Sequence, residues 1–234
     1  MIRVADQPAF VLHQRPYRET SVLLEVLTRD QGRVGLVARG LRSARPRWPR
    51  GLLSPFVALR VGYSGRGELL SLSAVEAAGP PLGLGGPSLI SGLYVNELLV
   101  RLLARHDPHP ELLGRYGLLL EELAQGTALA WSLRRFERDL LGMLGFAPLL
   151  TEVAGHGSAV DPAQAYSYDP EHGPVPFSER AVPPRVSGAA LLALAREEPP
   201  GTAIQGELRQ FMRAVLRHHL GGRELNAWRT LAQR

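Results

Sequence analysis

The 234-residue sequence contains neither cysteine nor lysine. Without cysteine the chain can form no disulfide framework and no zinc site that depends on thiolate ligands. Without lysine it can use neither Schiff-base chemistry nor a phosphate-binding loop that needs a lysine side chain. All 27 basic residues are arginine. A biased genomic base composition explains this usage, and its chemical consequence is a set of side chains suited to phosphate contact and to stacking on bases.

Long hydrophobic runs are also absent. The longest uncharged stretch, residues 77–96, contains five glycines and three prolines, which would interrupt a membrane-spanning helix. The first 14 residues include Arg3 and Asp6 and lack the continuous apolar region of a signal peptide. We therefore expect a cytoplasmic protein with no membrane partner.

Positive charge is concentrated in the first third of the chain. Residues 1–80 hold twelve arginines and six acidic residues, whereas residues 81–234 hold fifteen arginines and sixteen acidic residues. A basic segment joined to a nearly neutral one favours a polyanion as the partner of the basic segment.

Hydrophobic periodicity predicts an α+β protein of two domains. Alternating apolar residues indicate five short strands, at residues 9–15, 21–28, 33–39, 56–61 and 69–76. Five strands with a long loop after the third fit a small closed barrel of the OB type, which predicts an OB-fold DNA-binding domain over residues 1–80.

The glycine- and proline-rich residues 79–87 separate this barrel from a mostly helical domain, residues 81–234. Helical periodicity predicts helices at residues 88–105, 111–125, 128–144, 187–197, 202–220 and 223–231. Residues 146–184, rich in proline, glycine and histidine, are predicted to be an irregular excursion.

The strongest local signal for a binding site is the twelve-residue segment 39–50, which contains five arginines, one tryptophan and no acid. Two prolines prevent regular structure, so we expect a loop that binds nucleic acid, with arginine supplying charge and Trp48 a stacking surface. Arg33 and Arg39, on the outward face of a strand, would extend it. A solvated loop is the alternative, and Trp48 could instead belong to the core. The candidate DNA-binding residues are Arg33, Arg39, Arg42, Arg45, Arg47, Trp48 and Arg50.

Two helical groups of arginines are further candidates. Arg209, Arg213 and Arg217 form a stripe at helical spacing, which is either a secondary DNA contact or a solvated face. Arg134 and Arg138 lie beside an apolar face that includes Leu133 and Phe136. An acidic, apolar peptide tail would suit that arrangement, and ion pairs with Glu137 or Asp139 are the alternative.

No catalytic, metal or cofactor site is predicted. His106 and His109 have ligand-like spacing, but the neighbouring prolines place them in a turn that lacks a third ligand. Paired-carboxylate patterns and glycine-rich phosphate loops are absent. We therefore expect a protein that is not an enzyme.

The order and spacing of several segments resemble the RecO family of bacterial recombination mediators. They are Ala9-Phe-Val-Leu-His13, Glu19-Thr-Ser21, Gly32-Arg33, Val37-Ala-Arg-Gly40, Ser91-Gly-Leu-Tyr-Val-Asn-Glu-Leu-Leu99, Leu133-Arg-Arg-Phe-Glu137, Leu141-Gly-Met-Leu-Gly-Phe146 and Leu220-Gly-Gly222. Many members carry a four-cysteine zinc module after the third helix. This chain has no cysteine there and resembles the zinc-less subgroup.

The resemblance implies an OB-fold, a helical domain and a role in DNA repair and recombination without catalysis. It implies binding of single- and double-stranded DNA, annealing of complementary strands, and help in loading recombinase onto DNA coated with single-strand binding protein (SSB). RecR and the C-terminal tail of SSB are the implied partners, the latter at Leu133, Arg134, Phe136 and Arg138, and the bacterial nucleoid is the implied location. The alternatives are an OB-fold RNA-binding or translation accessory protein, and an enzyme such as a nuclease.

Overall fold

The computed structural model describes residues 1–49, 51–155, 157–177 and 184–228. The chain divides into two compact units. The first comprises Met1–Thr127 together with Leu225–Arg234, and the second comprises Ala128–Glu224. The expected boundary after residue 80 lies inside the first unit, and a separate domain over residues 1–80 stays a prediction.

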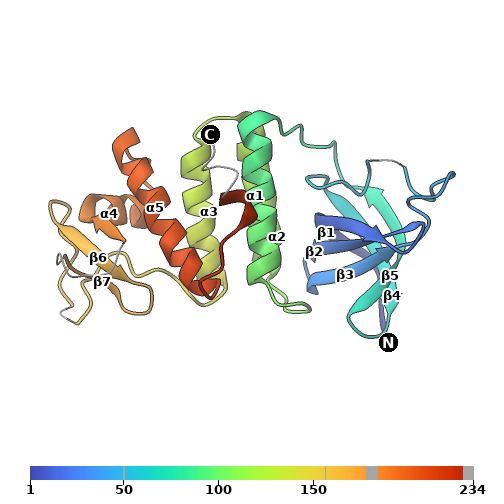
Figure 1. Cartoon of the computed structure of the whole chain (residues 1–234), viewed down its shortest axis with the longest axis horizontal. Coiled ribbons are helices and arrows are strands. Elements are labelled where there is room, and N and C mark those ends of the chain that lie inside the picture. The colour runs from blue at the N-terminus through green and yellow to red at the C-terminus, as the bar shows by residue number, and fades with distance from the viewer. Residues whose placement is uncertain (50, 156, 178–183, 229–234) are drawn as a thin grey trace. The chain divides into compact units, whose positions relative to one another are not determined.

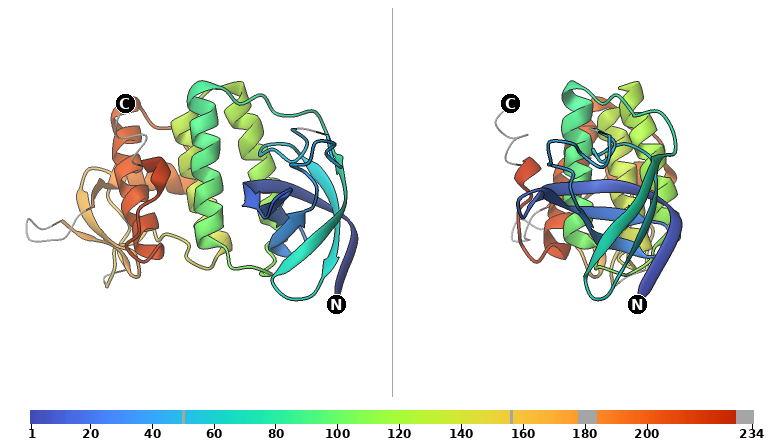
Figure 2. Two further views of the ribbon diagram at one scale, coloured as in Figure 1. Left: turned by 45° about the vertical axis from the view of Figure 1, so that its right-hand side comes forward. Right: turned by 90° about the vertical axis from the view of Figure 1, so that its right-hand side faces the viewer.

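The first unit begins with a closed five-stranded barrel. Its strands are β1 (Ile2–Tyr17), β2 (Ser21–Thr28), β3 (Gly32–Ala38), β4 (Leu59–Gly65) and β5 (Leu69–Ala77). The order is β1-β2-β3-β5-β4, with β4 closing onto β1, and every pairing except β3 with β5 is antiparallel. This is the predicted OB-type barrel. Figure 2 shows the long, curved β1 running along it from the N-terminus.

Alternation along the strands builds the core of the barrel. In β3, Val34, Leu36 and Ala38 are fully buried, as their period-two spacing predicts. They pack with apolar side chains from the other four strands, including Val11, Leu24, Val61 and Leu70. The predicted strands were right in number and order. β1 is longer at both ends than predicted, and β4 begins three residues later.

Helices α1 (Gly86–Leu102) and α2 (Pro110–Gln125) complete the first unit and pack beside β1 and β2 (Figure 1). Each begins with a proline in its first turn, where the missing N–H costs no hydrogen bond. α2 ends at Gly126, whose φ of 73° is the left-handed conformation that glycine adopts without steric penalty.

A buried polar bridge joins β1 to both helices. β1 bulges between Val11 and His13. Asn96 of α1 donates a hydrogen bond to the carbonyl of Leu12 at 2.9 Å and accepts one from the Tyr116 hydroxyl of α2 at 2.6 Å. The Tyr116 ring also packs edge-on against Phe10, with centroids 5.1 Å apart. Asn96 therefore satisfies a strand carbonyl and fixes the two helices against the same strand.

The chain returns to the first unit at its C-terminal end. Leu225 and Trp228 are buried, and the Glu97 carboxylate of α1 accepts hydrogen bonds from the backbone N–H groups of Asn226 and Ala227 at 2.9 and 3.0 Å. A carboxylate at this place caps the short helical turn at residues 226–228. The rest of the predicted terminal helix lies outside the described residues.

In its described residues, the second unit contains three helices and a small sheet. The helices are α3 (Leu129–Met143), α4 (Gly188–Arg196) and α5 (Thr202–His219). The prediction of an irregular excursion over residues 146–184 is wrong in part, because β6 (Ala165–Asp169) and β7 (Gly173–Pro176) form a hairpin there. β8 (Arg185–Ser187) pairs with the other edge of β6. These strands were not predicted because they are short and the prolines and glycines around them interrupt the alternation of apolar and polar residues.

We predict that Tyr116→Phe lowers the free energy of unfolding by about 1–2 kcal/mol, because the buried oxygen of Asn96 loses its donor. Urea denaturation measures the change. Tyr17→Phe is the matched control, since the Tyr17 side chain is only half-buried and its hydroxyl makes no hydrogen bond among the described residues. Equal stability of the two variants would show that the Asn96 bridge is not a source of stability.

Candidate nucleic-acid interface

Part of the positive charge of the barrel is neutralised by its own acids. Arg29 pairs with Asp30 at 2.7 Å, and Arg60 of β4 pairs with Asp6 of β1. A hydrogen bond from Arg60 lowers the pKa of the Asp6 carboxyl, and one from Arg29 lowers that of Asp30. Both acids are therefore ionised at neutral pH, and these two arginines belong to local pairs.

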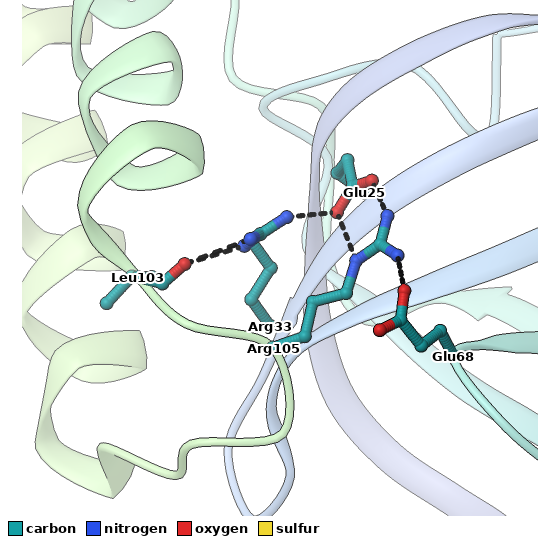
Figure 3. A network of polar contacts seen from close by, with 5 residues as sticks. All are labelled: Glu25, Arg33, Glu68, Leu103 and Arg105. Carbon is teal, nitrogen blue, oxygen red and sulfur yellow. Dashed lines mark hydrogen bonds and ion pairs between the residues drawn. The ribbon is translucent and has the colours of Figure 1, made fainter.

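Glu25 of β2 binds two more arginines (Figure 3). Its carboxylate is only 12% exposed and accepts from Arg33 of β3 at 2.5 Å and from Arg105, which follows α1. Arg33 also donates to the carbonyl of Leu103 at 3.0 and 3.1 Å, and Arg105 reaches Glu68 at 3.3 Å. The network holds the barrel to the segment that connects α1 and α2.

Backbone contacts reinforce this attachment of the barrel, around Arg33, to the segment after α1, around Arg105; we call it the joint. The N–H of His106 donates to the carbonyl of Arg33 at 3.0 Å. Gly32 has a φ of 61°, and a Cβ atom added there would lie 1.9 Å from the carbonyl oxygen of Asp107. Only glycine fits this approach, so the start of β3 is shaped to receive the connecting segment.

The structure therefore corrects the prediction that Arg33 extends the basic surface. It lies on the outward face of β3, as expected, but its guanidinium group is turned to Glu25 and Leu103. Six residues of strand also place it roughly 20 Å from Arg39. Sequence reasoning missed this role because the carbonyl of Leu103, which Arg33 also binds, lies 70 residues away along the chain.

The predicted basic loop follows β3, and its described arginines lack acidic partners. Arg39, Arg42 and Arg45 are exposed, and none of them makes an ion pair within the described part of the chain. Arg50, the last predicted member, lies outside the described residues. The loop therefore presents cationic groups to solvent that the barrel itself does not neutralise.

Trp48 packs against the barrel core and is partly buried. The guanidinium group of Arg47 lies 4.6 Å from the centroid of its ring, and the same group donates to the carbonyl of Ser73 in β5 at 3.2 Å. Of the two sequence alternatives for Trp48, the structure favours packing against the core. Arg47 and Trp48 anchor the loop to β5.

The tip of the β1–β2 hairpin lies beside this loop, and the sequence analysis missed it. The N–H of Arg42 donates to the carbonyl of Thr20 at 2.8 Å. Arg15 and Arg18 are exposed at this tip, without an ion pair among the described residues, and Tyr17 lies between them. The sequence did contain a signal for this tip, because two arginines flank an aromatic residue at the end of a predicted strand.

The arginine stripe of α5 is only partly available. Arg209 and Arg217 are exposed, whereas Arg213 pairs with Glu224 at 3.4 Å. The opposite face of α5, with Leu208, Phe211 and Val215, is buried as predicted. Two of the three arginines thus remain open to a ligand.

The candidate peptide-tail site on α3 is corrected by the structure. Arg134 is buried and forms an ion pair with Glu137, whose side chain is fully buried. Arg138 donates to the carbonyl of Leu194 at 2.7 Å and pairs with Asp139 and Glu197. Phe136 is fully buried and Leu133 is half-buried. The alternative of ion pairs within the domain is therefore the observed arrangement.

Within the described residues there is no cluster of three or more histidine, aspartate or glutamate side chains that could hold a metal ion. In the same part of the chain, no helix is long and apolar enough to cross a bilayer. What the described arginines can do chemically is bind an anion.

Comparisons with known proteins agree with the fold. The sequence matches the family models "Recombination protein O N terminal" over residues 1–81 and "Recombination protein O C terminal" over residues 86–229. It is 46% identical to the DNA repair protein RecO of Stenotrophomonas maltophilia (strain K279a), over 98% of this chain and 97% of that protein. It is 45% identical to the DNA repair protein RecO of Xanthomonas oryzae pv. oryzae (strain PXO99A), over 97% of this chain and 96% of that protein.

An OB-type barrel is a fold that holds oligonucleotides in many proteins, and the exposed arginines at one end of this barrel suit a polyanion. Among such proteins, the two matches and the high identity along the whole chain show that the chain belongs to the RecO family of DNA repair proteins. The predicted resemblance is confirmed.

We predict that Arg134→Ala lowers the free energy of unfolding by about 3 kcal/mol, because it breaks the buried ion pair between Arg134 and the Glu137 carboxylate. Thermal or denaturant unfolding measures the loss. Arg209→Ala, which removes an exposed and unpaired arginine in the same unit, serves as the control and should be close to wild type. Unchanged stability of Arg134→Ala would contradict a structural role for this pair.

Proposed function

We propose that this chain binds single- and double-stranded DNA through the basic loop and the hairpin tip, and anneals complementary strands. The observation that carries the proposal is that the arginines of the barrel fall into two groups, those held in ion pairs and those exposed without one. Arg15, Arg18, Arg39, Arg42 and Arg45 are exposed and lack ion pairs among the described residues, and they gather where β1 ends and β3 leads into the loop.

Binding at such a surface gains free energy from the release of counterions that DNA phosphates condense around themselves. Because arginine has a weakly hydrated, planar guanidinium group, it can contact phosphate oxygens in pairs. Neutralising phosphates on two strands lowers their mutual repulsion, and bases that remain exposed can then pair. Annealing by this route needs no catalytic group.

The proposal extends to mediation of recombination. The chain would act on DNA coated with SSB, with RecR as a further partner, and help to load recombinase in the cytoplasm at the nucleoid. Arg209 and Arg217 of α5 are proposed as a secondary DNA contact, because both are exposed and neither forms an ion pair within the described chain. Arg217 also donates to the carbonyl of Gly222 at 3.4 Å. The SSB tail is not assigned to Arg134, which is buried.

Complementary oligonucleotides, bare and coated with the cognate SSB, test the proposed function. Wild-type protein should accelerate annealing of both, and RNA competitor of equal length should inhibit less than DNA competitor. Acceleration of neither pair would overturn the annealing proposal. Stronger inhibition by RNA would favour an RNA-binding protein instead.

We predict that the triple variant Arg39→Ala, Arg42→Ala, Arg45→Ala weakens binding to single strands of any sequence. Each lost phosphate contact flattens the log–log salt dependence by about 0.7, so three should flatten it by roughly two units. Fluorescence anisotropy over a salt series measures the slope.

The matched control removes three arginines that the structure pairs with acids: Arg29→Ala, Arg60→Ala, Arg101→Ala. Both variants lose the same formal charge, so the control separates a local surface from a general effect of net charge. Equal slopes for the two variants would remove the basic loop from the interface.

A further inference from the structure

Tyr17 is the last residue of β1 and lies directly opposite Ser21 of β2. Side chains that are directly opposite share a face of the sheet, and residues two apart on one strand share it too. Arg15 therefore lies on the same face as Tyr17. It pairs in register with Leu23, and Leu23 in turn with Val37 of β3.

The same register brings the basic loop to Tyr17. Val22 pairs with Ala38, which is the last residue of β3, and Ser21 and Arg39 are the next residues of the two segments at this end. With about 4.8 Å between neighbouring strands, the backbones of Tyr17 and Arg39 are roughly 10 Å apart. The hydrogen bond from the Arg42 N–H to the carbonyl of Thr20 ties the loop to this tip. The hairpin tip that carries Tyr17 and the start of the basic loop therefore lie at the same end of the barrel.

The backbone at the tip keeps one of these arginines on the ring. Arg18 has a φ of 54°, a left-handed conformation that is unfavourable for a side chain of this type. Its guanidinium group lies 5.2 Å from the centroid of the Tyr17 ring. Glu19 is the single acid between Arg15 and Thr20, and it forms no ion pair among the described residues.

The two aromatic residues near the basic loop differ in what the protein does with them. Trp48 packs on the barrel core, and its indole nitrogen is buried. Tyr17 is half-buried, lies outside that core cluster, and its hydroxyl makes no hydrogen bond within the described chain. Tyr17 is therefore the aromatic ring that a ligand can use.

We infer that Tyr17 is the base-stacking residue of the DNA interface and that it strengthens the binding of single strands relative to duplex. The inference rests on the proposed function. A base of a single strand joins the stack that Tyr17 and Arg18 already form, while Arg15 and Arg39 bind the flanking phosphates. In a duplex the bases are stacked on each other, so the ring gains nothing there and only the arginines contribute.

Three DNA probes of equal length test this inference: a single strand, an abasic single strand and a duplex. Tyr17→Ala should weaken binding of the base-bearing strand by about tenfold, as loss of one stacked base does. Binding of the abasic strand and the duplex should not change. Tyr17→Phe keeps the ring and should bind all three probes as the wild type does.

Each other outcome overturns the inference in a recognisable way. Equal weakening on the abasic strand would mean that Tyr17 acts through the phosphates or the fold, and thermal unfolding of the variant would show which. No weakening on any probe would remove Tyr17 from the interface, while the arginine triple variant could still support the proposed function. If the wild-type protein binds no probe at all, the proposed function fails and this inference fails with it.

Discussion

The Glu25 carboxylate lies nearly buried between Arg33 and Arg105, and the attachment of the barrel to its helices depends on it. A carboxylate removed from water is stable only if cations and hydrogen bonds replace the lost hydration. Two guanidinium groups do so, and Arg33 also reaches the carbonyl of Leu103. The segment after α1 is thereby held against the start of β3, where Gly32 leaves room for it.

The positions of the acids also determine which arginines of the barrel form ion pairs and which do not. Three acids of the barrel form ion pairs with its arginines: Glu25 at the start of β3, Asp30 at the β2–β3 turn, and Asp6 between β1 and β4. Arginines at those places are neutralised. At the hairpin tip and in the loop after β3, Glu19 is the single carboxylate among the described residues, so that end of the barrel stays cationic. Arg3 and Arg66 are also unpaired among the described residues, and they lie toward the other end of β1. The distribution of acids within the barrel thus divides its arginines into those held in ion pairs and those that a polyanion can bind.

Much of the fold could be predicted from the sequence, because apolar alternation and glycine- and proline-rich breaks are local signals. Strand β2 was predicted with its observed bounds, and the barrel was predicted correctly in strand number. The candidate site could be predicted only in part. An arginine-rich loop is visible in the sequence, but whether an arginine is free depends on partners that folding brings near. Arg33 meets Arg105 and Glu25, and Arg138 meets Glu197 59 residues later. Tyr17 was missed because its position at the same end of the barrel as the basic loop follows from strand register, which cannot be read from the sequence.

Hydrogen exchange of backbone amides, with and without a single-stranded oligonucleotide, tests the central claim most directly. If the unpaired arginines of the hairpin tip and the basic loop form the main interface, added protection should appear at residues 15–20 and 39–48, and in the second unit only at the proposed secondary contact on α5. The joint at residues 25–35 and 103–107, which holds its arginines in ion pairs, should exchange as before. Protection at the joint or only in the second unit, with none at the hairpin tip and loop, would contradict the account.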